Sequence, residues 1–214
     1  MADVKDRATP RIEPTPNGPY RVRNLKSLSN SKGETLETRT VIALCRCGRS
    51  NNKPLCDGTH AEVGFDSSKL TDGSLNKRDT YPAGRLAIHD NRGICAHVGR
   101  CTDGLPAVFR LGEEPWIRPM GVDEGTIIAQ IRQCPSGALS YSIDGVELRD
   151  QNRAPAIQVS KNGPYVVTGG VELDVDEWGE GASKEHYTLC RCGGSNNKPF
   201  CDGTHWKGFK DDNN

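Results

Sequence analysis

The chain has 214 residues, of which only 34% are hydrophobic, and its 28 basic side chains are balanced by 28 acidic ones. It contains no block of like charges and no apolar stretch long enough to span a bilayer, which argues against a nucleic-acid-binding arm and a membrane anchor. The nine cysteines are an odd number and cannot all form internal disulfides, and their spacing points to metal as the stabilising element of a chain poor in core-forming residues.

The predicted elements begin with a module that we assign to residues 1–66. An Asn-Gly-Pro turn at residues 17–19 is followed by a predicted strand over 20–23. A polar loop then leads to a second predicted strand over 38–44. This second strand runs directly into the first cysteines of the chain.

Three cysteines and one histidine follow the second predicted strand at a spacing typical of metal ligands. Cys45 and Cys47 are separated by one residue, so a strand would place both thiols on one side. Cys56 and His60 lie four residues apart, so one helical turn would place them on a common face. We expect Asp57 to cap that turn. The four side chains can therefore converge on one centre.

A different module follows, which we assign to residues 81–148. It is preceded by a polar segment, 67–80, that we interpret as a linker. The predicted elements of this module are a strand over 85–89, a helical turn over 105–109, a strand over 116–118, a helix over 123–133 capped by Asp123, and a strand over 138–143.

The middle module contains three cysteines: Cys95, Cys101 and Cys134. A bacterial ferredoxin run reads Cys-x2-Cys-x2-Cys with a later Cys-Pro. Laid on that pattern, these three cysteines take the first, third and fourth positions, whereas the second position falls on Val98, which cannot ligate iron. His97 is the nearby candidate for a fourth ligand.

After a second predicted linker, 149–156, the last module repeats the first over residues 157–214. An offset of 145 residues relates the two copies, and fourteen of the sixteen motif positions are identical. The repeated module again has a predicted strand over 165–168 and another over 186–189. Its ligand set is Cys190, Cys192, Cys201 and His205, with Asp202 as the expected cap.

Four basic residues flank the ligands, at equivalent positions of the two copies: Arg46 and Lys53, Arg191 and Lys198. One interpretation is that they are solvated surface charges. The other is that they donate hydrogen bonds toward cluster sulfurs and tune a reduction potential.

From ligand chemistry alone, three cysteines and one histidine suit either a structural zinc ion or an iron–sulfur centre. The order of the residues, Cys-x-Cys-x2-Ser-x3-Pro-x-Cys-Asp-Gly-Thr-His in both copies, resembles the CDGSH iron–sulfur domain of mitoNEET-type proteins. The one departure is threonine in place of serine, at Thr59 and Thr204. The resemblance implies a [2Fe–2S] cluster in each copy. Its ligands would be Cys45 and Cys47 on one iron with Cys56 and His60 on the other, and then Cys190, Cys192, Cys201 and His205 in the same arrangement.

The middle module also resembles a family, the divergent mono-cluster ferredoxins. The similarity lies in Cys-x-His-x3-Cys, in Pro-Trp-Ile-x-Pro at 115–119 and in Cys-Pro-Ser-Gly-Ala-Leu at 134–139. Three cysteines are enough for a [3Fe–4S] cluster held by Cys95, Cys101 and Cys134. A [4Fe–4S] cluster is the alternative and would take His97 as its fourth ligand.

We therefore expect an α+β protein made of two small β-rich CDGSH modules with a ferredoxin-like α+β module between them in sequence. Because CDGSH domains of this family pair as homodimers, the resemblance implies that the tandem copies form an equivalent pseudo-twofold pair within one chain. The protein would then be a monomer.

The leading functional hypothesis is electron transfer or redox sensing through protein-bound iron–sulfur clusters, with a redox partner protein. One alternative is storage or delivery of clusters to an apo iron–sulfur acceptor, and another is a structural zinc protein. We expect no enzymatic activity and no nucleic-acid or membrane partner, because no catalytic motif is present. Residues 1–10 are charged and lack an apolar signal-peptide core, so we expect a cytoplasmic protein.

Overall fold

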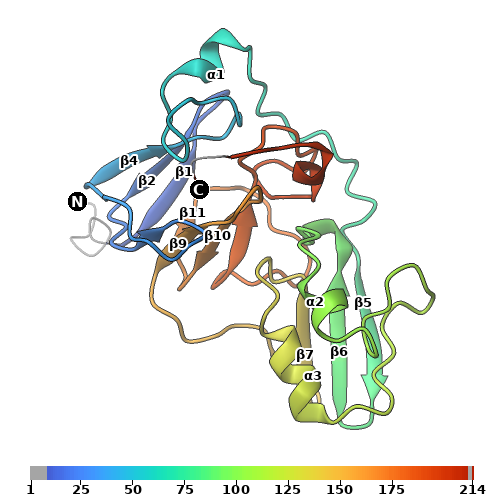
Figure 1. The fold of residues 1–214 in the computed structure, drawn as a ribbon. Coiled ribbons are helices and arrows are strands. Elements are labelled where there is room, and N and C mark those ends of the chain that lie inside the picture. Colours follow the sequence, from blue (N-terminus) through green and yellow to red (C-terminus); the bar gives the residue numbers. More distant parts are fainter. Residues whose placement is uncertain (1–8, 212–213) are drawn as a thin grey trace.

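The computed structural model describes residues 9–211 and 214, and it contains three four-stranded sheets (Figure 1). Residues 1–8, which belong to the first predicted module and to its charged N-terminal segment, lie outside the described residues, as do residues 212–213 of the last module. The described chain is mostly β-structure with few and short helices, which agrees with the expected β-rich modules.

Two of the sheets are each built from strands of both repeated copies. The first has the order β11-β1-β2-β4 and the second the order β12-β10-β9-β3. The strands of the first copy are β1 (Arg11–Pro14), β2 (Tyr20–Arg23), β3 (Leu28–Ser29) and β4 (Val41–Leu44). Those of the second copy are β9 (Ala156–Val159), β10 (Tyr165–Thr168), β11 (Glu172–Leu173) and β12 (Tyr187–Leu189).

The outer strand of each sheet comes from the opposite copy. β3 pairs in parallel with β9, where Leu28 is opposite Ile157, and β11 pairs in parallel with β1, where Glu172 is opposite Arg11. The other neighbours are antiparallel and belong to one copy. Each copy thus contributes one strand to the sheet of the other, and backbone hydrogen bonds join the two copies at both places.

Alternating side chains explain why these short segments form strands. In β2, Tyr20 and Val22 are fully buried while Arg21 is exposed, which is the two-residue period of a half-buried strand. The strands predicted over 20–23 and 165–168 are confirmed, and the one predicted over 38–44 begins only at Val41.

Both copies contribute to one hydrophobic core. At its centre, the rings of Tyr20 and Tyr165 meet edge to face with their centroids 6.1 Å apart. Buried aliphatic residues surround them, including Ile12 and Val22 from the first copy and Ile157 from the second. Because neither half of this core is complete alone, the two motifs are held in a fixed relation to each other.

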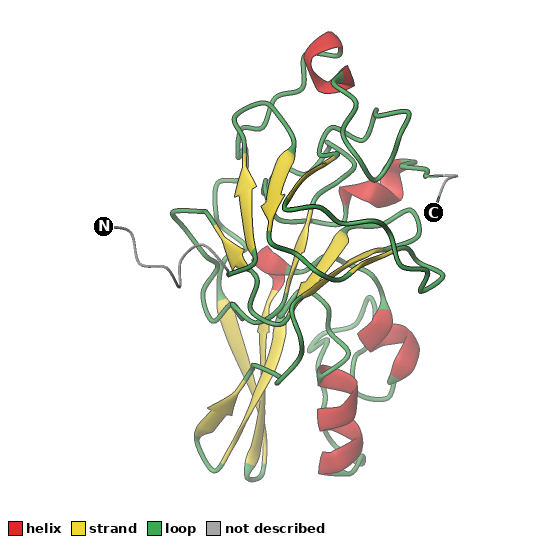
Figure 2. Cartoon of the chain, turned by 90° about the vertical axis from the view of Figure 1, so that its left-hand side faces the viewer, coloured by secondary structure: helices red, strands yellow, loops and turns green. Residues whose placement is uncertain are grey.

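The middle unit has a sheet and a core of its own. The sheet order is β5-β6-β7-β8, with all neighbours antiparallel, and two short helices lie beside it (Figure 2). Its elements are β5 (Arg78–Ala83), β6 (Leu86–Asn91), the 3-10 helix η2 (Arg92–Ile94), α2 (Arg100–Gly104), α3 (Glu124–Ile131), β7 (Leu139–Ile143) and β8 (Val146–Leu148).

The helix predicted over 123–133 is present as α3, and Asp123 caps it by accepting a hydrogen bond from the Thr126 N–H at 2.9 Å. The helical turn predicted over 105–109 is present as a hydrogen-bonded turn, in which the N–H groups of Val108 and Phe109 both donate to the Leu105 carbonyl at 3.0 Å. It is separate from the preceding helix α2, which the sequence did not predict and which ends at Gly104. The physical reason is Pro106, whose ring disfavours helical dihedrals at Leu105. Leu105 has φ −145° and ends the helix.

The segment predicted as the first linker, 67–80, lies partly on the second copy. The N–H groups of Leu70 and Thr71 both donate to the Asn196 carbonyl, at 2.7 and 3.0 Å, and β5 begins at Arg78. Two short helices complete the fold, α1 (Thr59–Glu62) and the 3-10 helix η3 (Thr204–Lys207). Figure 1 shows α1 at the end of the molecule away from α3, whereas η3 lies on the side of the middle unit. None of the helices in the described part of the chain is both long and apolar enough to cross a membrane.

Candidate metal centres

Backbone hydrogen bonds bring the two ligand-bearing loops of each copy together. In the first copy, the Cys45 N–H donates to the Pro54 carbonyl at 2.8 Å, and the Cys56 N–H donates to the Ala43 carbonyl at 2.9 Å. The equivalent bonds of the second copy start from Cys190 and Cys201. The Cys-x-Cys segment that follows the strand is therefore placed beside the loop that carries the third cysteine.

The ligands of each copy lie in two close pairs. In the first copy, Cys45 Sγ is 3.8 Å from Cys47 Sγ, and Cys56 Sγ is 3.3 Å from His60 Nδ1. In the second copy, the matching distances are 3.6 Å between Cys190 and Cys192 and 3.4 Å between Cys201 and His205. Within residues 9–211 and 214, no group of three or more His, Cys, Asp or Glu side chains is placed to hold a single metal ion.

An aspartate organises the loop that carries each histidine. The Asp57 carboxylate accepts hydrogen bonds from the Thr59 hydroxyl at 2.7 Å, from the Thr59 N–H at 3.1 Å and from the Asn51 N–H at 2.8 Å. These hydrogen bonds lower the pKa of Asp57. Asp202 makes the same backbone bonds to Thr204 and Asn196. Both aspartates therefore tie down the start of the short helix, as expected, although the boundary residue is the glycine that follows.

The flanking arginines are buried, so their interpretation as solvated surface charges is wrong. Arg191 is 2% exposed; it forms an ion pair with Asp211, and its Nε donates to the Gly163 carbonyl at 2.6 Å. Arg46 is 4% exposed and lies over the Tyr20 ring at 5.1 Å. These guanidinium groups hold the backbone and aromatic core behind each motif, and Arg46 does so through its hydrogen bond to the Thr15 carbonyl at 3.2 Å, although its Nε has no partner among the described residues.

The lysines also bind backbone. Lys53 Nζ donates to the Ser50 carbonyl at 2.5 Å, and Lys198 Nζ donates to the Ser195 carbonyl at 2.7 Å. Lys198 is buried, whereas Lys53 is only half-buried. Each ammonium thus fixes the loop between the second and third cysteines of its copy.

The two copies differ in the exposure of their Cys-His pair. Cys56 and His60 are half-buried, whereas Cys201 and His205 are buried. The cause is the middle unit, which packs only against the second copy at this point. Trp206 Nε1 donates to the His97 carbonyl at 2.7 Å. Among the residues that the structure describes, none covers the Cys-His end of the first copy in this way, and a methyl group at Gly58 would meet no atom within 4 Å.

The three cysteines of the middle unit line one cavity of about 790 Å³. Cys95 directly follows η2, Cys101 lies in α2, and Cys134 follows the end of α3. Burial raises the pKa of the Cys95 and Cys101 thiols, and electrostatic repulsion from Cys134 adds to both shifts. The structure therefore brings together the residues that the spacing predicted.

His97 lies beside these cysteines and also against the second copy. Its backbone N–H points to Cys95 Sγ at 3.4 Å. A methyl group at Gly203 would stand 2.9 Å from the His97 Cβ and 3.1 Å from its Cδ2. The ring carbons thus face the second copy. Sequence reasoning missed this role of His97 as an inter-unit contact, and it gave Trp206 no role.

The donor sets fit iron–sulfur centres chemically. Burial raises the pKa of the Cys45, Cys56, Cys95, Cys101 and Cys201 thiols, because a thiolate is costly away from water. Such thiols become stable thiolates when a metal cation supplies the compensating charge. Soft sulfur donors and imidazole are the ligands that iron–sulfur clusters use.

Comparison with known families agrees with this chemistry. The model of the iron-binding zinc finger of CDGSH type matches residues 17–61 and again residues 162–206. The chain belongs to the CDGSH family. Between the two matches, the divergent 4Fe-4S mono-cluster model covers residues 81–144, so the chain is a tandem CDGSH iron–sulfur protein with a divergent mono-cluster unit in the middle.

Curated relatives extend the comparison. The uncharacterized protein YjdI of Escherichia coli K12 is 41% identical over 61 residues, which are 28% of this chain and 80% of that protein. YjdI of Escherichia coli O157:H7 matches to the same extent. No solved structure matches the chain significantly.

Proposed function

We propose that this tandem CDGSH protein transfers single electrons, or senses redox state, through two [2Fe–2S] centres and one [3Fe–4S] centre. The first [2Fe–2S] centre would be held by Cys45, Cys47, Cys56 and His60, and the second by Cys190, Cys192, Cys201 and His205. The third would be held by Cys95, Cys101 and Cys134. When bound, these clusters supply one-electron chemistry, and the protein supplies position, burial and hydrogen bonds.

The observation that carries the proposal is the pairing of the ligands in each copy. A two-iron cluster needs two protein ligands on each iron, and each motif presents a Cys-Cys pair and a Cys-His pair. A single zinc ion would instead need all four ligands around one point. Because no three such side chains surround a single point within the described residues, the paired geometry favours the iron–sulfur interpretation over structural zinc.

For the middle unit, the orientation of His97 supports a three-cysteine centre. Its ring carbons lie against Gly203 of the second copy, and only its backbone N–H is directed to Cys95 Sγ. A [4Fe–4S] centre, with His97 as the fourth ligand, is the alternative and would need the ring to turn toward the cysteines.

The residues around the thiols would tune the centres. The Arg49 N–H lies 3.4 Å from Cys47 Sγ, and the His97 N–H lies 3.4 Å from Cys95 Sγ. Hydrogen bonds to ligand sulfurs stabilise negative charge there and favour the reduced state. The buried position of Cys45 and Cys190, both 1% exposed, excludes water from the inner side of each CDGSH centre.

We further propose that the two copies form a pseudo-twofold pair, as CDGSH domains do in homodimers. Reciprocal contacts support it. The Tyr20 hydroxyl donates to the Cys190 carbonyl at 2.8 Å, and the Tyr165 hydroxyl donates to the Cys45 carbonyl at 2.9 Å. The backbone contacts are reciprocal as well, because β3 of the first copy pairs with β9 of the second and β11 of the second copy pairs with β1 of the first. The protein would act as a monomer with modules at 1–66, 81–148 and 157–214, separated by 67–80 and 149–156.

The proposed partner is a redox protein in the cytoplasm, and we propose no catalytic residue. A second candidate function is delivery of clusters to an apo acceptor, which the half-buried Cys56 and His60 favour because a ligand pair near solvent is open to exchange.

Anaerobic incubation with an apo-ferredoxin separates the two functions. Electron transfer predicts clusters that stay on the protein through repeated reduction and re-oxidation, followed by their visible spectrum. Rapid, stoichiometric appearance of holo-ferredoxin would contradict electron transfer and support delivery.

A further inference from the structure

We infer that the contact between the second copy and the middle unit is an internal electron-transfer interface, with His97 and Trp206 as its positioning residues. It would connect the centre of Cys95, Cys101 and Cys134 to the second CDGSH centre, and not directly to the first. This inference rests on the proposed function, because both centres must hold clusters.

The first support is a direct contact at the histidine-bearing helix of the second copy. Trp206 lies in η3, one residue after the ligand His205, and its Nε1 donates to the His97 carbonyl at 2.7 Å. Gly203 packs so tightly against the His97 side chain that a methyl group there would lie 2.9 Å from its Cβ. His97 is in turn two residues from Cys95. The contact therefore joins ligand-bearing segments of two different centres.

A second hydrogen bond holds the same two segments from the other side. Asn197 Nδ2, in the loop before Cys201, donates to the Gly93 carbonyl at 2.8 Å. Gly93 belongs to η2, which leads directly into Cys95. The stretch that carries Cys95 is thus clamped to the second copy at both ends, so the separation of the two centres is fixed by structure and not by a flexible linker.

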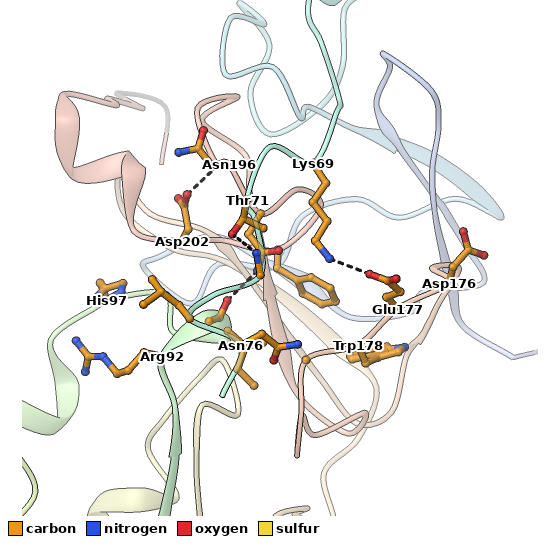
Figure 3. A pocket seen from close by; sticks show the side chains of 17 residues that line it. Lys69, Thr71, Asn76, Arg92, His97, Asp176, Glu177, Trp178, Asn196 and Asp202 are labelled. Carbon is orange, nitrogen blue, oxygen red and sulfur yellow. Dashed lines mark hydrogen bonds and ion pairs between the residues drawn. The ribbon is translucent and has the colours of Figure 1, made fainter. Parts of the chain in front are cut away.

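Two cavities meet at His97. One, of about 790 Å³, holds the three cysteines of the middle unit, and the other, of about 620 Å³, is lined by Asn196, Asn197 and Asp202 of the second copy. Figure 3 shows the second cavity, with His97 and Arg92 on one side and Asp202 and Asn196 above them. His97 lines both cavities, so it forms part of the wall between the cavity of the three cysteines and the cavity beside the loop that precedes Cys201.

The first copy provides the internal comparison, because it has the same motif without the contact. The 145-residue offset maps Asn197, Gly203 and Trp206 onto Asn52, Gly58 and Ala61, and these three are exposed. A methyl group at Gly58 would meet no atom within 4 Å. The first centre instead adjoins the second through backbone, where a methyl group at Gly48 would lie 2.6 Å from the Cys192 carbonyl oxygen.

The exchange is a simple one-electron step. One centre is oxidised by one electron and the other is reduced by one electron, with no bond made or broken and no proton moved. The external electron enters or leaves through the proposed redox partner protein.

The test is electron paramagnetic resonance of the full chain during an anaerobic redox titration with dithionite, a one-electron reductant. The signal of the central centre is the observable. We expect magnetic splitting of that signal to appear when the second CDGSH centre becomes paramagnetic. Gly203→Ala, whose methyl group meets His97, should lose the splitting, and Gly58→Ala should keep it. Both substitutions fall on glycines with positive φ, 86° and 95°, so backbone strain is matched.

Trp206→Phe keeps the aromatic ring and removes only the donor to His97, and it tests the inference if Gly203→Ala does not fold. It should reduce the splitting and speed hydrogen exchange of amides 95–101, a readout that does not depend on the clusters' spectra. Equal splitting in all variants, or an unsplit central signal in the wild type with every centre present, would overturn the inference. Absence of the cluster signals themselves would overturn the proposed function on which it rests.

Discussion

The two copies of the motif share fourteen of sixteen residues, yet the second is packed against the middle unit and the first is open to solvent. The ligand pairs are nearly identical, at 3.8 and 3.3 Å in the first copy and 3.6 and 3.4 Å in the second. Local sequence therefore sets the ligand geometry. The exposure of the Cys-His pair is set by tertiary contacts outside the motif.

The buried arginine behind each motif shows the same contrast. Arg191 is paired with the fully buried carboxylate of Asp211, whereas Arg46 has a buried Nε without a hydrogen-bond partner among the described residues. The second copy is thus the more completely satisfied of the two. The predictions that follow test this difference, beginning with the largest expected effect.

Asp211→Ala should destabilise the protein by about 3–5 kcal/mol, because it leaves the guanidinium of Arg191 buried without its counter-ion. Denaturant unfolding measures the change. Ser67→Ala is the control at the equivalent place after the first motif, where the Ser67 N–H donates to Asn17 Oδ1 as the Asp211 N–H donates to Asn162 Oδ1. No such ion pair exists there among the described residues, and loss of the exposed hydroxyl, which hydrogen-bonds with Asn17, should cost at most about 1 kcal/mol. Equal losses of unfolding free energy in both variants would contradict the proposed difference between the two copies.

Acid should weaken the second copy through Glu185, whose counterpart in the first copy is Thr40. Burial raises the pKa of Glu185, but hydrogen bonds from Arg153, Gly169 and Gln151 outweigh it and lower the pKa to about 2. In the unfolded chain, the Glu185 carboxyl has a pKa of about 4.3. The folded protein therefore gains the full stabilisation from the ionised Glu185 above that pH and loses it as the pH falls toward 2.

We expect this acid-dependent loss to be about 1–2 kcal/mol, since solvent screening reduces the full linkage value. Unfolding free energies measured between neutral and acid pH check it. Glu185→Gln should flatten the pH dependence in that window, and a wild-type slope that persists unchanged in the variant would refute the assignment.

A chelator should remove iron from the first centre faster than from the second, on the order of tenfold, which corresponds to about 1.4 kcal/mol. The reason is that a chelator reaches the half-buried Cys56 and His60 more easily than the buried Cys201 and His205. Cys190→Ser and Cys45→Ser each leave one CDGSH centre, so loss of visible absorbance can be followed separately. Equal rates in the two variants would show that exposure does not govern release.

The smallest effect should come from the paired asparagines. Asn197→Ala removes the hydrogen bond to the Gly93 carbonyl and should cost about 1 kcal/mol. Asn52→Ala, at the exposed equivalent position, should change the unfolding free energy by less than about 0.5 kcal/mol. Hydrogen exchange around η2 locates the change, and protection lost equally in both variants would argue against docking of the second copy alone.

The sequence predicted the parts of the molecule that are governed by local pattern. The Asn-Gly-Pro turns indicated the starts of β2 and β10, Asp123 indicated the start of α3, and the ligand spacing placed Cys56 next to His60. Each of these depends on neighbours within a few residues. Their local signals were therefore sufficient.

The features that the sequence did not reveal depend on distant contacts. β3 and β11 have two residues each and lie in the variable loops, so no periodicity marks them as strands that pair with the opposite copy. Trp206 differs from Ala61 at a surface position, and nothing local indicates that it bonds to His97. Arg46 and Arg191 carry charge beside a loop, and only the assembled core shows that they are buried.

The central claim is that the chain holds two CDGSH iron–sulfur centres and one further cluster. Assays of iron, sulfide and zinc on the purified protein, with its visible spectrum, test it most directly. The account predicts a coloured protein with about seven irons per chain, two from each [2Fe–2S] centre and three from a [3Fe–4S] centre, whereas about eight would indicate a central [4Fe–4S] cluster. A colourless protein that contains zinc and no sulfide would contradict the account.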